Sequence, residues 1–378
     1  MKKINAYLIY IYFAPLILSL YLISVSGYLL GDFRSFSYSL SPIDIISVLL
    51  FYFVPFLMLY VVIKITNRVK VKDFSDLDLE GFLFKVFIFI GIVTIFFGAN
   101  KIGQDPVPGL SGVFIKIAGK LNPLALLPLI AFSKISTKKF FICLLVTALY
   151  GYRQESLQGY FITLLCLGVF IIKNYNLKTS VFILILAIPF IFSGPVLSLA
   201  SYLYSIRNEM RGVGFNLDEI LSLAIGRVST TSSLLFIESN SFDFNAISDY
   251  FSLGIISERL IGLSSFGSVT PSDIFNLQTI GAGQSYSIFM GLPGFLFFLF
   301  NGDAFTAIFN LLFLTSVFVV IYLLIPVVDK KNRVCVFFLV MFFPLLSFDI
   351  WEISIAFQTV IIWRVLIFLL VKRRKITS

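Results

Sequence analysis

Long apolar runs separated by short polar segments dominate the sequence. A helix needs about 20 residues to cross the hydrocarbon layer of a bilayer, and most of the runs approach or exceed that length. The pattern therefore predicts a polytopic membrane protein. The clearest predicted membrane helices are residues 7–30, 43–65, 82–99, 121–132, 304–328, 334–348 and 353–371.

A short apolar hairpin is predicted between Lys139 and Lys173, where 33 residues must cross the membrane and return. Two full crossings need about 20 residues each. The polar tip, which contains Arg153 and Glu155, is therefore predicted to lie below the outer headgroups. A charged residue at that depth usually faces a cavity or a partner. The structural alternative is an ion pair, either between these two residues or between helices.

Composition supports the membrane interpretation. The chain is 58% hydrophobic and 13% charged, with a mean hydropathy of +0.98, whereas soluble domains are about 45–50% apolar and about 25% charged. We therefore expect an all-α integral membrane helix bundle of about ten spans. The three cysteines lie in apolar runs and imply no disulfide framework. The net charge of +9 is attributed to loop asymmetry rather than to nucleic-acid binding.

The longest polar interval separates two groups of predicted membrane helices. Within it, residues 217–237 and 246–263 are apolar enough to form helices on the membrane surface. Residues 284–300 are expected to enter and leave on one side, as a re-entrant or surface helix. The predicted parts are 1–204, N-terminal transmembrane helices; 205–285, a large periplasmic segment; and 286–378, C-terminal transmembrane helices.

Basic residues indicate the orientation, because they are enriched in short cytoplasmic loops. With both termini inside, the cytoplasmic side holds 19 of the 29 basic residues, and 15 of the 19 are lysine. The outer side holds nine, of which six are arginine. The last basic residue, Arg364, falls inside the final predicted helix.

Arginine replaces lysine in the long polar interval. From Lys178 to Lys330 every basic residue is an arginine, and four arginines lie in the interval: Arg207, Arg211, Arg227 and Arg259. The planar guanidinium fork suits phosphate and carboxylate oxygens, whereas lysine is a point charge. On a helix, Arg207 and Arg211 would lie one turn apart and repel each other unless an anion lay between them. Interfacial snorkelling is the alternative explanation.

The chemistry of the chain is limited by what the sequence lacks. It has no P-loop, no dinucleotide fingerprint and no cluster of metal ligands, so no cofactor and no metal are predicted. The absence of histidine excludes a histidine general base. A base would therefore be a carboxylate, and the candidates, which the sequence does not rank, are Glu155, Glu209, Glu238, Asp249 and Glu258.

Three local sequences carry a resemblance to a known family. They are LYGYR at 149–153, RNEMRG at 207–212 and SIFMGLPG at 287–294. With the length, the many predicted spans and the long external interval, they make the chain resemble the O-antigen and oligosaccharide-repeat-unit polymerases (Wzy type). The arginine-x10-glycine repeat of some members is absent. Related O-antigen ligases carry a histidine in the external loop, and its absence here favours a polymerase.

The resemblance implies a reaction at the periplasmic face of the bacterial inner membrane. A growing glycan leaves undecaprenyl pyrophosphate and joins an incoming undecaprenyl-pyrophosphate-linked oligosaccharide. The expected partners are these lipids, the bilayer and, as a further candidate, a chain-length regulator; nucleic acid is not expected. The expected catalytic residues are Arg207, Arg211, Arg153, Glu155 and Glu209. The expected substrate-binding residues are Arg227, Arg259, Tyr204 and Glu258.

The main alternative is a flippase or transporter of lipid-linked oligosaccharides. Such a protein typically contains internal repeats and charges along a central path. The sequence shows no internal repeat, and only Arg153 and Arg364 are candidates for basic charge in mid-membrane.

Overall fold

The computed structural model describes residues 2–34, 36–66, 79–97, 123–133, 135–154, 157–175, 180–184, 202, 222, 225–239, 291–292, 296, 304–325, 330–347 and 350–377. In this part of the chain the regular structure is helical, apart from one isolated bridge between Tyr28 and Ser37. The all-α prediction is thus confirmed for these residues. The elements are α1 (Lys2–Ser26), η1 (Gly31–Phe33), α2 (Pro42–Thr66), α3 (Leu79–Phe97), α5 (Pro123–Phe132), α6 (Thr137–Gln154), α7 (Leu157–Asn174), α11 (Thr231–Ser239), α16 (Ala304–Leu324), α17 (Lys330–Ser347) and α18 (Ile350–Thr377).

Two of the described helices are long and apolar enough to cross a bilayer. They cover Lys3–Ser26 and Pro42–Thr66, with mean hydropathies of 2.1 and 2.6. Shorter apolar helical stretches of 10–17 residues lie in α3, α5, α7, α16 and α17. The hairpin helices α6 and α7 have 18 residues each, or about 27 Å at 1.5 Å per residue, slightly less than the bilayer core.

Local sequence signals explain where α1 ends and α2 begins. Gly27 adopts a φ of 71° and its N–H bonds the Ile23 carbonyl at 2.9 Å, which is a glycine stop that ends α1 before the predicted residue 30. A capping box starts α2. The Asp44 carboxylate accepts the Ser41 N–H at 2.7 Å, and the Ser41 hydroxyl accepts the Asp44 N–H at 3.2 Å.

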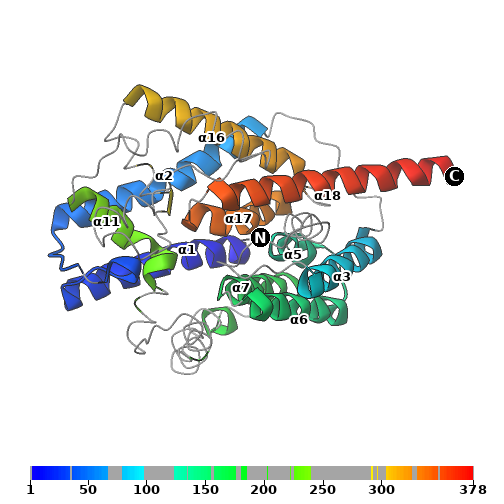
Figure 1. Ribbon diagram of the computed structural model, residues 1–378, viewed down its shortest axis with the longest axis horizontal. Helices are drawn as coiled ribbons and strands as arrows, with labels where there is room; N and C mark the ends of the chain where they lie inside the picture. The colour runs from blue at the N-terminus through cyan, green and yellow to red at the C-terminus, as the bar shows by residue number, and fades with distance from the viewer. Residues whose placement is uncertain are drawn as a thin grey trace.

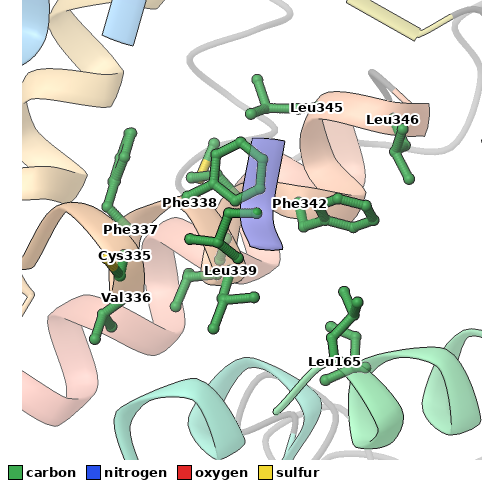
Figure 2. Close-up of a cluster of buried hydrophobic side chains, with 14 of the residues drawn as sticks. Leu165, Cys335, Val336, Phe337, Phe338, Leu339, Phe342, Leu345 and Leu346 are labelled. Carbon is green, nitrogen blue, oxygen red and sulfur yellow. The ribbon is translucent and has the colours of Figure 1, made fainter. Parts of the chain in front are cut away.

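The helices form two groups that meet at α17. One group contains α1, α2, α11, α16 and α18, and the other contains α3, α5, α6 and α7 (Figure 1). Helix α17 contacts α1, α5, α7, α16 and α18. Eight successive residues, from Cys335 to Phe342, are buried, so α17 is enclosed on all sides. Figure 2 shows this cluster, with Leu165 of α7 facing it.

The count of basic residues assigns several helix ends to the cytoplasmic side of the membrane. In the structure these ends lie together. The Lys173 ammonium at the end of α7 donates to the Ser133 carbonyl just after α5, at 2.8 Å. Lys139, at the start of α6, lies 5.7 Å from the Phe84 ring centroid near the start of α3. The first turn of α17 likewise contacts the last turn of α16. Helix α18 extends beyond the other helices toward the C-terminus (Figure 1).

The prediction of a single surface helix over residues 217–237 is wrong. The described part contains a helical stretch at 225–229, then Thr230 with a φ of 53°, and then α11. Seven successive residues of α11, from Thr231 to Ile237, are buried. Hydropathy alone missed this burial, because polar side chains in the segment find hydrogen-bond partners on α1 and α2.

Candidate functional site

The loop between α1 and α2 is a short, hydrogen-bonded hairpin. The Leu29 N–H bonds the Phe36 carbonyl at 3.0 Å, and the Tyr38 N–H bonds the Gly27 carbonyl at 2.9 Å. Arg34 lies at its tip and donates from Nη1 to the Gly31 carbonyl at 3.2 Å. This loop, residues 27–41, is called the α1–α2 loop below.

The middle of the long polar interval is attached to this loop. The Leu30 N–H donates to the Ser232 hydroxyl at 2.7 Å. The Phe236 ring of α11 lies 4.7 Å, centroid to centroid, from the rings of both Phe33 and Phe36. Helix α11 therefore lies against α1, α2 and the loop (Figure 1). Helix α11 and the α1–α2 loop, about 200 residues apart in the sequence, are thus held together by both polar and aromatic contacts.

Hydroxyl groups fill the junction between α11 and the two long helices. Ser19 of α1 donates to the Thr231 hydroxyl at 2.8 Å, and the hydroxyls of Tyr52 of α2 and Thr230 lie 3.0 Å apart. The Ser229 hydroxyl is buried and has no hydrogen-bond partner. We call Ser19, Tyr52, Ser229, Thr230 and Thr231 the hydroxyl cluster; each is at most 2% exposed. A β-branched residue in the left-handed region is strained, and the strain at Thr230 is held in place by these contacts.

The carboxylates of Asp44, at the start of α2, and Glu238, in α11, are near enough to interact electrostatically beside the α1–α2 loop. Burial, and then the nearby Asp44 charge, raise the pKa of Glu238 above its ordinary value of 4.5. One Glu238 carboxylate oxygen is buried without a hydrogen-bond partner. Burial, the charges of Asp44 and Glu238, and a hydrogen bond to Asp44 raise the pKa of Tyr38 to about 12. Tyr38 is therefore a neutral donor to Asp44, and Glu238 is a carboxylate prepared to take up a proton.

Gly31 is bonded by the Arg34 side chain and lies against the backbone of Arg227. Arg34 binds its carbonyl, and a Cβ built on Gly31 would lie 3.5 Å from the backbone nitrogen of Arg227. Arg227 is half-buried in the helical stretch at 225–229. Arg34 is not among the site residues predicted from the sequence. One signal could have revealed it, because Arg34 is the only basic residue between Lys3 and Lys64 and so shows the same preference for arginine as the long interval.

The structure places only some of the predicted site residues. Arg227 lies beside the α1–α2 loop, and so does Glu238, one of the candidate bases. Arg153 is exposed in the last turn of α6, in the other group of helices, beside a close approach of the α6 and α7 backbones at Gly151 and Gly159. The remaining predicted residues lie outside the described part of the chain: Glu155, Tyr204, Arg207, Glu209, Arg211, Asp249, Glu258 and Arg259.

Among the residues that the structure describes, no three His, Cys, Asp or Glu side chains lie together as a metal site would require. The Asp44–Glu238 pair contributes only two carboxylates. The chemistry that this arrangement can perform directly is anion binding by arginine and proton uptake by a carboxylate.

Comparisons with family models, with curated proteins and with solved structures find no match to this chain. Over the residues that it describes, the structure defines an all-helical protein with two helices long and apolar enough to cross a membrane.

Proposed function

We propose that the protein is a polymerase of lipid-linked oligosaccharide repeat units, embedded in the bacterial inner membrane through about ten spans. It transfers a growing glycan from undecaprenyl pyrophosphate to the terminal sugar of an incoming lipid-linked unit. The α1–α2 loop and the long polar interval face the periplasm in this proposal.

One observation carries the proposal: two arginines and a carboxylate with a raised pKa lie on or beside the α1–α2 loop. Arg34 binds the Gly31 carbonyl, the Arg227 backbone lies against Gly31, and Glu238 of α11 is near enough to Asp44 and Tyr38 to interact with them electrostatically. A transferase of this kind needs fixed cations for a diphosphate and a base for a sugar hydroxyl. Both kinds of group lie on or beside one hydrogen-bonded loop, at the end of the bundle where arginine outnumbers lysine.

The proposed reaction divides the work among these groups. The bond between the donor sugar carbon and the pyrophosphate oxygen breaks, and its electron pair leaves with undecaprenyl pyrophosphate. Arg207 and Arg211 bind that leaving diphosphate, and Arg153 lines the floor of the site. Arg227 and Arg34 hold the acceptor lipid's phosphates. The acceptor hydroxyl attacks the sugar carbon, and its proton passes to Glu238.

The experiment compares the lipid-linked glycans of a deletion strain with those of complemented strains, separated by size. Deletion is expected to leave single repeat units on the lipid carrier. Complementation with Arg34→Lys or Arg227→Lys should restore short chains at most, because lysine keeps the charge and loses the fork. Lys138→Arg, an exposed position at the opposite end of the bundle, is the matched control and should restore full-length polymer. Full-length polymer in the deletion strain would refute the proposal.

A transporter of lipid-linked oligosaccharides is the second candidate, and one observation favours it. The helix break at Thr230 lies among buried hydroxyl groups, and broken helices commonly form the binding sites of transporters. The deletion strain separates the two functions. Loss of a transporter leaves no single repeat units accessible on the periplasmic side, whereas loss of a polymerase leaves them accessible and unjoined.

A further inference from the structure

The helical part of the long polar interval is interrupted at one residue, Thr230. The stretch at 225–229 ends there, and α11 begins at Thr231. The Thr230 N–H still bonds the Gly226 carbonyl at 2.9 Å, and the Thr230 carbonyl accepts the Leu234 N–H at 3.4 Å. The interruption is therefore confined to the left-handed φ of 53° at Thr230.

The helical stretches on both sides of this turn contact the same residue of the α1–α2 loop, Leu30. A Cβ built on Gly226 would lie 2.7 Å from the Leu30 carbonyl carbon, and the Ser232 hydroxyl accepts the Leu30 N–H at 2.7 Å. A continuous helix would place Gly226 and Ser232 about 9 Å apart along its axis and about 120° apart around it. A straight helix would therefore not bring both residues onto Leu30, whereas the left-handed turn at Thr230 does.

Gly291 and Tyr52 hold the Thr230 side chain, which is 1% exposed. A Cβ built on Gly291 would lie 2.7 Å from both the Cβ and the Cγ2 of Thr230, and Gly291 itself has a φ of 65°. The hydroxyls of Thr230 and Tyr52 lie 3.0 Å apart. A β-branched residue adopts a positive φ only where its surroundings impose it. These long-range contacts, and not the local sequence, therefore maintain the turn.

We propose that Thr230 and Gly291 are positioning residues for Glu238, the base of the polymerase. They lock the turn that sets where α11 carries Glu238 relative to Arg227. This role rests on the function proposed above. Glu238 lies eight residues beyond Thr230, or about 12 Å along the helix axis. A change of about 10° at the turn would move it by about 2 Å, and a misplacement of about 1 Å can cost a factor of about 100 in rate.

The first test measures glycan extension by Thr230→Gly in reconstituted vesicles. Glycine adopts the φ of 53° without strain, so the variant can fold, but it lacks the side chain that holds the turn. We expect kcat to fall at least about tenfold while KM changes less than about twofold, because the base moves and the arginines stay on the loop. The rise of the rate with pH should move to lower pH, since Glu238 then leaves its buried place beside Asp44.

Gly291→Ala tests the same turn from the other side. Its Cβ would meet the Thr230 side chain, so it should lower kcat and shift the pH profile in the same direction. Gly81→Ala is the control, because a Cβ there meets no atom within 4 Å, and it should behave like the wild type. A wild-type kcat, or a pH profile that does not move, in Thr230→Gly would overturn the inference.

A second measurement needs no activity and separates this inference from the proposed function. Glu238→Gln is introduced into the wild type and into Thr230→Gly, and the thermal unfolding midpoints are compared at neutral pH. If the turn positions Glu238 beside Asp44, the rise in midpoint that glutamine produces in the wild type should fall by roughly half or more in Thr230→Gly. An equal rise in both backgrounds would overturn the inference. A wild-type protein that forms no polymer would refute the proposed function, and the midpoints would still decide whether the turn positions Glu238.

Discussion

Gly226 and Gly31 touch through their backbones. A Cβ built on Gly226 would lie 2.5 Å from the Gly31 Cα and 2.7 Å from the Leu30 carbonyl carbon. No side chain fits there without moving the backbone of one of the two segments. Arg227 follows Gly226 directly, and the Arg34 guanidinium binds Gly31, so this contact brings together the two segments that carry these arginines.

Gly226→Ala should separate the long polar interval from the α1–α2 loop. Because the clash is with backbone atoms, we expect a destabilisation of about 1–3 kcal/mol and a loss of polymer formation. The thermal unfolding midpoint of the purified protein and the glycan size distribution measure the two effects. Gly81→Ala is the control, since a Cβ there meets no atom within 4 Å and alanine favours a helix. Equal midpoints for Gly226→Ala and the wild type would contradict the predicted close contact.

Alanine substitutions at two serines of the hydroxyl cluster should have different effects on the stability of the protein. Ser19 donates to Thr231 at 2.8 Å, so Ser19→Ala should cost about 1 kcal/mol. The Ser229 hydroxyl has no partner, so its removal relieves an unsatisfied buried group and Ser229→Ala should be neutral or stabilising. Thermal unfolding of both variants in the same detergent provides the comparison. The prediction fails if Ser229→Ala is the more destabilising of the two.

The hydroxyls of Tyr52 and Thr230 should be energetically coupled. They lie 3.0 Å apart in a buried environment, and residues in direct contact show non-additive effects. A double-mutant cycle of Tyr52→Phe and Thr230→Ala is expected to give a coupling of about 1 kcal/mol. Thr230→Ala also removes the Cγ2 methyl group, and that loss cancels in the cycle because it occurs both with and without the Tyr52 hydroxyl. Strictly additive effects would show that the contact contributes nothing to stability.

Glu238→Gln should make the protein more stable at neutral pH. A carboxyl whose pKa is raised on folding stabilises the protein fully below its ordinary value, 4.5, and that contribution is lost as the pH rises through the raised value. Glutamine removes the charge beside Asp44, so the unfolding midpoint should exceed that of the wild type at neutral pH and approach it in acid. A wild-type midpoint at neutral pH equal to that of Glu238→Gln would contradict the shift.

The same substitution should abolish polymer formation if Glu238 is the general base. The wild-type rate is then expected to rise with pH through the pKa of Glu238, which is raised above its ordinary value of 4.5. The rate of glycan extension in reconstituted vesicles, measured as a function of pH, tests this expected rise. Glu238→Gln with full activity would exclude the role of base while leaving the stability prediction intact.

Much of the helical scaffold follows from local sequence. Unbroken apolar runs favour helices buried in lipid or protein. This pattern alone predicted a helix at residues 43–65, and the structure has α2 at Pro42–Thr66. The end of α1 was predicted four residues too late, because Gly27 ends the helix at Ser26 and hydropathy does not register a glycine stop. The preference for arginine between Lys178 and Lys330 was likewise visible in the sequence.

Only the tertiary structure brought the site residues together. The pairing of Gly31 with Gly226, the raised pKa of Glu238 beside Asp44 and the burial of Thr231–Ile237 all join segments nearly 200 residues apart. No periodicity in one segment contains information about its distant partner. A hydroxyl side chain has the same hydropathy whether it faces water or a hydrogen-bond partner in the core. The sequence determined which stretches are helical and where arginine is preferred, and long-range packing decided which polar groups meet.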